Sequence, residues 1–367
     1  MPHQRLQVAI PWSALGTHPR IFPFFLPFRG CVTRCLFCAQ DIVTGQNTNH
    51  APLKPLLDQL FTSLKLAANS HPLELAFYGG TFTALDEAEF ALCLEFVQAA
   101  YAQNLLTSVR CSTRPDTLTP KRLCALRKAH FTTIELGIQS FHQESLAICR
   151  RSYDQDLAYQ ACQLVREFGF KLGLQLLPGM PKNTPELFLA DVQKAIQCQA
   201  DFLRFYPCLV LANTGLAKLW AMGAFKPWEL DLTIETLALA LNLANAAQVP
   251  VIRMGLPQEM DQSKILAGPV CFDLGSRVQA KALFLTISDL LGKYSKLRPD
   301  FDLTGLFLPK SLQGFFWGHK KELSQAYANL GLTKDKISFG GYAAPYLEFY
   351  QEGIRDFEGL GLDGRQP

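Results

Sequence analysis

Strand-like and helix-like segments alternate along the chain from residue 21 to residue 207. Six short apolar runs predict strands, at residues 21–27, 73–80, 108–115, 132–140, 170–178 and 201–207. Five segments with apolar residues at i, i+3 and i+4 predict the helices between them, at residues 53–64, 86–103, 119–129, 154–169 and 184–198. Strands that are separated by helices pair in parallel, as a doubly wound sheet or as a full or partial barrel.

Polar residues on one face of the predicted sheet favour the barrel. Leu73, Leu75 and Phe77 share one face of the second strand, whereas Glu74 and Tyr78 lie on the other. Later strands repeat the pattern, with inward polar residues at Arg110, Ser112, Arg114, Glu135, Gln139, Gln175, Arg204 and Tyr206. We therefore predict an α/β fold, a partial (βα)6 barrel of the TIM type whose polar interior holds a ligand.

The predicted barrel occupies residues 1–225, and a small C-terminal α+β appendage occupies residues 226–367. Of the 367 residues 49% are hydrophobic and the formal net charge is +3, which is typical of a globular protein and too small for a dedicated nucleic-acid binder. Eleven cysteines, most of them isolated, do not form a disulfide framework. The sequence shows no export signal or membrane span, so a reducing cytoplasm is the expected location.

Three cysteines are clustered in "FRGCVTRCLFCAQ", residues 28–40, directly after the first predicted strand. Parallel α/β folds carry their chemistry at this end of the strands. A zinc site with His50 as fourth ligand and a group of merely buried thiols are two interpretations of Cys31, Cys35 and Cys38. A third is a [4Fe–4S] cluster, in which three thiolates leave one iron open to a small molecule.

The spacing of Cys31, Cys35, Phe37 and Cys38, C-x3-C-x-aromatic-C, resembles that of the radical S-adenosylmethionine (radical SAM) superfamily. The resemblance implies a [4Fe–4S] cluster on the three cysteines, beside Phe37, that reductively cleaves SAM. It further implies a 5′-deoxyadenosyl radical that abstracts a substrate hydrogen, and an external electron donor such as flavodoxin or ferredoxin.

Further segments resemble SAM-binding motifs of the superfamily. The stretch "YGGTF", residues 78–82, resembles the glycine motif, which implies that Gly79, Gly80 and Thr81 present backbone groups to the methionine amine. In "GIQSF", the resemblance places Gln139 at the ribose, and it places Arg151 at the SAM carboxylate. Ser112 stands where a polar side chain of the third strand often contacts SAM.

The Elongator-catalytic-subunit-like (Elp3-like) branch is the closer resemblance, over about residues 20–225. It rests on "STRPD", "ELGIQS", "LPGMP" and "RFYPCLVLANTGLAKLW" in this order. Some members of that branch modify the wobble uridine of tRNA with an additional acetyltransferase domain, for which we find no motif, so we expect a stand-alone protein without that activity. The segment "VIRMGLP" with "LAGPV" resembles stand-alone bacterial members, but Cys271 stands in a motif that carries a histidine in those relatives.

The substrate is not identified by these motifs; a small molecule and an RNA both remain open. Inward residues such as Glu135, Gln175 and Arg204 either contact substrate or pair with one another, and Tyr206 is a candidate for relaying an electron or hydrogen. The alternative to a radical SAM enzyme is a non-catalytic iron–sulfur or zinc-binding module that has kept the fold.

Overall fold

A computed structural model describes the chain except for residues 1–3, 13–20, 47–50, 69–72, 256–259 and 352–367. The chain divides into two compact units. One consists of Ser13–Val278 and the other of Met1–Trp12 together with Gln279–Pro367.

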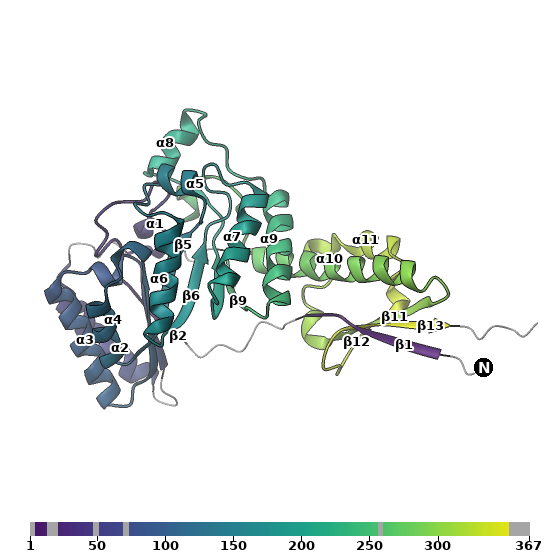
Figure 1. The fold of residues 1–367 in the computed structure, drawn as a ribbon, viewed down its shortest axis with the longest axis horizontal. Helices are drawn as coiled ribbons and strands as arrows, with labels where there is room; N and C mark the ends of the chain where they lie inside the picture. The colour runs from purple at the N-terminus through teal and green to yellow at the C-terminus, as the bar shows by residue number, and fades with distance from the viewer. Residues whose placement is uncertain (1–3, 13–20, 47–50, 69–72, 256–259, 352–367) are drawn as a thin grey trace, which may run out of the picture. The chain divides into compact units, whose positions relative to one another are not determined.

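The larger unit is built on a parallel sheet, in which the described residues form seven strands in the order β2-β3-β4-β5-β6-β7-β9 (Figure 1). The strands are β2 (Ile21–Phe25), β3 (Leu73–Tyr78), β4 (Leu106–Thr113), β5 (Phe131–Gln139), β6 (Lys171–Leu176), β7 (Phe202–Phe205) and β9 (Val251–Met254). The sheet is a half-barrel with β2 and β9 at its ends, which confirms the predicted α/β partial barrel.

The six predicted strands are all present, but the seventh strand, β9, corrects the six-fold prediction. Its four residues, "VIRM", are too few to show a period, and only their pairing with β7 makes them a strand. The helices of this unit are α1 (Gln40–Thr44), α2 (Leu53–Ala67), α3 (Glu87–Ala102), α4 (Pro120–Lys128), α5 (Gln143–Ile148), α6 (Gln155–Glu167), α7 (Pro185–Gln197), α8 (Gly215–Ala221) and α9 (Leu230–Ala246).

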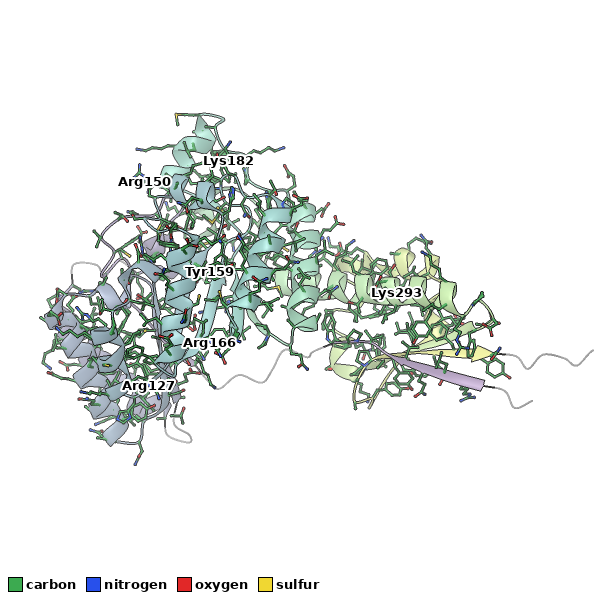
Figure 2. All side chains as sticks on the ribbon, in the orientation of Figure 1. Arg127, Arg150, Tyr159, Arg166, Lys182 and Lys293 are labelled. Carbon is green, nitrogen blue, oxygen red and sulfur yellow. The ribbon has the colours of Figure 1, made fainter. Side chains whose placement is uncertain are left out.

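Local sequence signals explain where the helices begin. The Thr119 hydroxyl accepts a hydrogen bond from the Arg122 N–H at 3.2 Å, and the Thr184 hydroxyl accepts one from the Leu187 N–H at 3.3 Å. A proline follows each threonine at the first helical position, where its missing N–H costs nothing. On the surface, the helices carry charged side chains such as Arg166 of α6 (Figure 2).

The core of this unit lies between the sheet and its helices. Phe77 is buried with Phe82 and Phe131, with ring centroids 4.9 and 5.9 Å from its own. Burying one such side chain contributes roughly 1.5–3 kcal/mol. Leu73, Leu75 and Phe77 therefore face the helices, as the alternation of the strand predicts, and the polar alternates face the interior of the half-barrel.

In the described part of the smaller unit, a sheet of four strands has the order β1-β13-β11-β12. Its strands are β1 (Gln4–Ala9), β11 (Asp302–Pro309), β12 (Ile337–Gly340) and β13 (Tyr346–Gln351). Residues 279–297 of α10 (Leu274–Leu297) and helix α11 (Ser324–Asn329) contribute Ile287 and Tyr327 to a core with Leu306 and Leu347. This mixed sheet with helices confirms the α+β appendage.

The two compact units do not coincide with the predicted boundary at residue 225. Strand β9 extends the barrel sheet, so residues 226–278 belong to the larger unit. Strand β1, near the N-terminus, pairs antiparallel with β13 and so belongs to the smaller one. A two-stranded antiparallel ladder of β8 (Val210–Leu211) and β10 (Ile265–Ala267) completes the described strands.

Candidate active site

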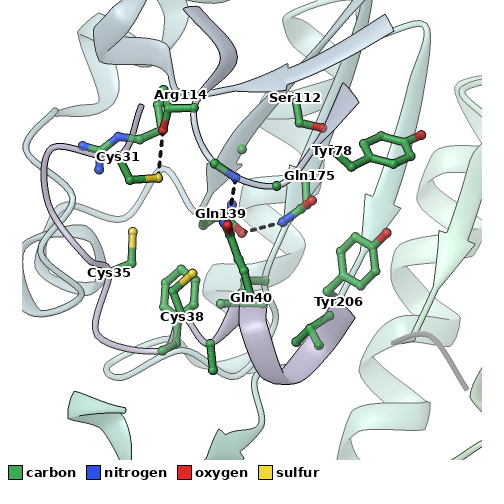
Figure 3. A pocket seen from close by; sticks show the side chains of 18 of the residues that line it. Cys31, Cys35, Cys38, Gln40, Tyr78, Ser112, Arg114, Gln139, Gln175 and Tyr206 are labelled. Carbon is green, nitrogen blue, oxygen red and sulfur yellow. Dashed lines mark hydrogen bonds between the residues drawn. The ribbon is translucent and has the colours of Figure 1, made fainter. Parts of the chain in front are cut away.

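A cavity of about 680 Å³ opens at the carboxyl ends of the parallel strands. The final residues of β2, β3, β4 and β5 line it, which are Phe25, Tyr78, Thr113 and Gln139. Figure 3 shows its interior, with the three clustered cysteines on one side and Tyr78 and Tyr206 on the other. The candidate cluster ligands, the candidate SAM-binding residues and the candidate relay residue all line this cavity, namely Cys31, Cys35, Phe37, Cys38, Gly79, Gly80, Thr81, Ser112, Gln139, Arg151 and Tyr206.

Cys31, Cys35 and Cys38 lie on the loop between β2 and α1, and all eleven cysteines of the chain are free thiols. Burial raises the pKa of Cys38 to about 12, and the neighbouring Cys35 and Cys31 add to the shift. Burial also raises the pKa of Cys31, whose sulfur lies 3.2 Å from the Thr81 hydroxyl. Desolvated thiols of this kind become stable thiolates when a metal centre supplies positive charge.

The donor set suits an iron–sulfur cluster, since three sulfur ligands come from one loop and face one cavity. In the described part of the chain, no group of three or more His, Cys, Asp or Glu side chains could hold a single metal ion, so the suitability for a cluster rests on the shared loop and cavity of the three thiols. His50, the candidate fourth ligand of a zinc site, lies outside the described residues.

The glycine motif is joined to the cysteine loop through Gln40. The Gln40 side-chain oxygen accepts hydrogen bonds from the Phe28 N–H at 2.6 Å and from the Gly80 N–H at 2.8 Å. A Cβ on Gly80 would lie 2.2 Å from the Arg29 carbonyl oxygen, and its φ is +61°, so only glycine fits. Over the described residues, the carbonyl oxygens of Gly79 and Gly80 accept no hydrogen bond, which leaves them available to an amine.

Arg151 is buried next to the cysteine loop. Its Nη1 donates to the Cys35 sulfur at 3.3 Å and its Nη2 donates to the Gly137 carbonyl of β5. The Tyr153 hydroxyl receives a hydrogen bond from Arg151 Nε at 3.0 Å and holds the guanidinium from the other side. A planar cation fixed in this way is suited to binding a carboxylate.

Gln139 is the last residue of β5 and has a φ of +68°, which is unusual for a residue other than glycine. Its side-chain oxygen accepts a hydrogen bond from Gln175 Nε2 at 3.3 Å (Figure 3). Unusual backbone angles of non-glycine residues are concentrated at functional sites, because the surrounding structure must hold them. Gln139 is therefore held with its side chain at the cavity wall.

Buried charges form a network in the barrel interior. Arg110 donates to Glu74 at 2.7 Å and to Glu135 at 2.9 Å, and Glu135 also accepts from Arg204 and from the Tyr78 hydroxyl. Most of these predicted inward residues therefore pair with one another, which offsets the cost of burying their charges. Beside them, burial raises the pKa of Tyr206, while the guanidinium groups of Arg204 and Arg253 oppose the shift.

Four residues of this site were not predicted as functional, namely Gln40, Arg114, Tyr153 and Arg253. Arg114 pairs with Asp116 at 2.6 Å and contacts the Thr33 hydroxyl of the cysteine loop at 3.2 Å. The sequence did point to two of these positions. Gln40 directly follows the cysteine motif, and the alternation of side chains along its predicted strand places Arg114 on the inward face. Tyr153 and Arg253 gave no signal, because Tyr153 acts only through its hydrogen bond with Arg151, and Arg253 lies on a strand too short to be predicted.

Cys271 is not among the residues that line the described cavity. Its thiol donates to the Asp273 carboxylate at 3.0 Å. Burial, together with this carboxylate, raises the pKa of Cys271.

Among the described helices, none has the length and apolar character needed to cross a bilayer.

Models of two protein families match the sequence. The radical SAM superfamily matches residues 25–195, and the Radical_SAM C-terminal domain matches residues 200–281. A tRNA uridine(34) acetyltransferase of Methanocaldococcus infernus is 30% identical over 197 residues, which are 47% of this chain and 37% of that protein. An oxygen-independent coproporphyrinogen III oxidase of Escherichia coli K12 is 25% identical over 219 residues, 58% of this chain and 48% of that protein.

A solved structure supports the fold. The Elp3 of M. infernus with an N-terminal deletion superimposes with a TM-score of 0.55 at 21% identity, and the match covers 78% of this chain and 71% of that one. The fold and the cavity define an α/β half-barrel enzyme with a thiol-bearing loop at the carboxyl ends of its strands. With the two family matches, the chain belongs to the radical SAM superfamily.

Proposed function

We propose that the protein binds a [4Fe–4S] cluster through Cys31, Cys35 and Cys38 and uses it to cleave SAM reductively. The observation that carries the proposal is the placement of all three thiols, with Arg151 hydrogen-bonded to Cys35, on the wall of one cavity. Three thiolates leave one iron of such a cluster without a protein ligand. When bound, the cluster and SAM supply an electron and a 5′-deoxyadenosyl radical that abstracts hydrogen from a substrate.

The chain's own residues would bind and orient SAM. The Arg151 guanidinium would pair with the SAM carboxylate, because it is a fixed planar cation beside the cluster loop. The open carbonyl oxygens of Gly79 and Gly80 would accept from the amine. Gln139 and Ser112 would meet the ribose from neighbouring strands, and Thr81 and Phe37 would close the site around the thiols.

Tyr206 lies across the cavity from the cysteines in Figure 3. A half-buried tyrosine at this place would face the substrate rather than the cluster, where it would relay a hydrogen or an electron. An external electron donor such as flavodoxin or ferredoxin would deliver the reducing electron to the cluster, as expected for this superfamily.

For the substrate, we propose only a chemical class. The archaeal relative is named for tRNA uridine(34), but the match spans 37% of its length, so its whole activity does not carry over. We propose that a substrate enters the cavity as a small molecule or as an exposed part of an RNA. The cavity volume of about 680 Å³ is in the range of small-molecule sites.

Metal analysis of anaerobically purified protein tests the cluster assignment. The proposal predicts iron and acid-labile sulfide in equal amounts, about four of each per chain in the fully loaded protein. Stoichiometric zinc without iron or sulfide would instead support the non-catalytic metal-binding alternative.

A further inference from the structure

Two arginines lie side by side at the end of the half-barrel formed by β7 and β9. Arg204 and Arg253 are direct register partners on these parallel strands, and both line the cavity. Like charges directly opposite one another on neighbouring strands are destabilising. The pair therefore places positive charge on this wall of the cavity, where an anionic ligand would be stabilised.

The described carboxylates balance only part of this positive charge. Glu135 pairs with Arg204 but is shared with Arg110, which also pairs with Glu74. Arg110 and Arg204 thus share two carboxylates, and Arg253 adds a third guanidinium on the strand next to Arg204. The Arg253 side chain makes no hydrogen bond or ion pair with any residue that the structure describes, so no described carboxylate balances its charge.

Unused hydrogen-bond donors accompany this excess charge. The Arg204 side chain is only 12% exposed, and its buried Nε has no hydrogen-bond partner among the described residues. Its guanidinium is stacked over the rings of Tyr78 and Tyr206, at 4.8 and 5.5 Å from their centroids, which fixes its orientation. A buried, oriented cation with a free donor is prepared for an acceptor.

We propose that Arg253 and Arg204 bind an anionic oxygen group of the substrate, a carboxylate or a phosphate. The inference rests on the proposed function, since it takes the cavity as the reaction chamber. It concerns a different group from the SAM carboxylate, which would be bound by Arg151 beside Cys35. Arginine forks suit both oxyanions, so the shared chemistry defines the substrate class.

The test measures binding of two simple anions to the full-length protein, reconstituted anaerobically and saturated with SAM so that Arg151 is covered. Inorganic phosphate or acetate replaces chloride at constant ionic strength, and the melting temperature is followed. A ligand that binds only the folded state raises this temperature, and the rise grows with the logarithm of its concentration above the dissociation constant. We expect one of the two anions to raise it, and the responding arm identifies phosphate or carboxylate.

Arg253→Gln should weaken that anion's apparent affinity about tenfold or more, the size of a charge-assisted contact. Because the Arg253 side chain is exposed and makes no hydrogen bond or ion pair with a described residue, the variant is expected to fold. Arg253→Lys, which keeps the charge but not the fork, should lose less. Arg166→Gln on the outer surface of α6 (Figure 2) is the matched control and should respond like the wild type.

An identical response in wild type and Arg253→Gln would overturn the proposal, as would the absence of a response to either anion in the wild type. The measurement needs no turnover. An Arg253-dependent anion response in protein that forms no 5′-deoxyadenosine would therefore contradict the proposed function and leave the anion site standing.

Discussion

At the scale of single residues, the site depends on how its loop positions sulfur and charge together. Cys35 receives a hydrogen bond from Arg151 at 3.3 Å, and Cys31 contacts the Thr81 hydroxyl at 3.2 Å. The Thr81 contact opposes the rise that burial causes in the pKa of Cys31, and Arg151 brings positive charge to the Cys35 sulfur. The residues around the cysteines thus prepare them as ligands.

Replacing one of these thiols should prevent cluster loading. In Cys35→Ser, the loop keeps its shape but offers two sulfur ligands, so iron after anaerobic reconstitution should fall from about four atoms per chain to below roughly one. Cys124→Ser is the control, because Cys124 is exposed and does not line the cavity. Equal iron and sulfide in Cys35→Ser and wild type would show that Cys35 is no ligand.

Arg151 should matter for SAM more than for folding of the loop. Arg151→Lys keeps the charge but loses the planar fork that contacts Cys35, Gly137 and Tyr153. We expect the SAM dissociation constant, measured by equilibrium dialysis on cluster-loaded protein, to rise about 10- to 100-fold.

Arg150, the neighbour of Arg151 in the chain, supplies the matched control. Arg150→Lys changes an exposed arginine that does not line the cavity and should leave SAM binding within about twofold of wild type. If the two variants bind SAM equally well, Arg151 does not hold the carboxylate.

At the scale of elements, the turn after β3 connects the sheet to the cysteine loop. The Thr81 N–H donates to the Arg29 carbonyl oxygen at 2.8 Å, and Gln40 bridges Gly80 to Phe28. The glycine motif is therefore structural as well as a candidate ligand contact, because the loop's backbone passes where a Cβ would be.

A pair of glycine variants separates the cost of a positive φ from the cost of a steric clash at this turn. Gly80→Ala must bear a φ of +61° and a Cβ 2.2 Å from the Arg29 carbonyl oxygen, whereas Gly223→Ala bears a φ of +71° with nothing within 4 Å. Gly223→Ala should lower the free energy of unfolding by about 1 kcal/mol, and Gly80→Ala by roughly 3 kcal/mol or more. Urea unfolding measures both, and equal losses would mean that the loop moves away freely.

The elements also show what sequence patterns could and could not predict. Long amphipathic helices with Thr-Pro starts, and strands that alternate such as Leu73–Tyr78, carried enough local signal to be predicted. Strand β9 did not, because four residues hold no period and its paired residues on β7 lie 48 or 49 positions earlier in the chain. Pairing at such a separation is a property of the tertiary structure.

The same distinction holds for the site. Cysteine spacing, the glycine pair and Gln139 are motifs in the sequence and could be predicted, and all of them line the cavity. Gln40, Tyr153 and Arg253 act through contacts between segments that are far apart in the chain or through one backbone turn. No local pattern predicts such contacts, because any surface glutamine, tyrosine or arginine looks the same in sequence.

At the scale of the whole molecule, the chain closes its smaller unit with its own N-terminal strand. Strand β1 pairs with β13 over the register from Gln4↔Gln351 to Ala9↔Tyr346, and Val8 and Ile10 are buried in the core of that unit. The smaller unit is thus assembled from both ends of the described chain, which a boundary between residues 225 and 226 does not capture.

Deleting residues 1–12 should destabilise the smaller unit selectively. Hydrogen exchange should become about tenfold or more faster in β13, which loses its edge partner β1, and in β11, which shares a core with the deleted Val8 and Ile10, while β3 to β6 keep their protection. Gln7→Ala is the control, since it removes only an exposed hydrogen bond to Glu348. Unchanged exchange in β13 after the deletion would contradict this account.

SAM cleavage by the reconstituted protein tests the central claim most directly. Wild-type protein carrying a [4Fe–4S] cluster is incubated anaerobically with SAM and dithionite, and 5′-deoxyadenosine and methionine are quantified, with Cys35→Ser as the control. We predict that both products form with the wild type and that neither forms with the variant. Absence of 5′-deoxyadenosine from a fully loaded wild-type sample would contradict the claim that this cavity is a radical SAM active site.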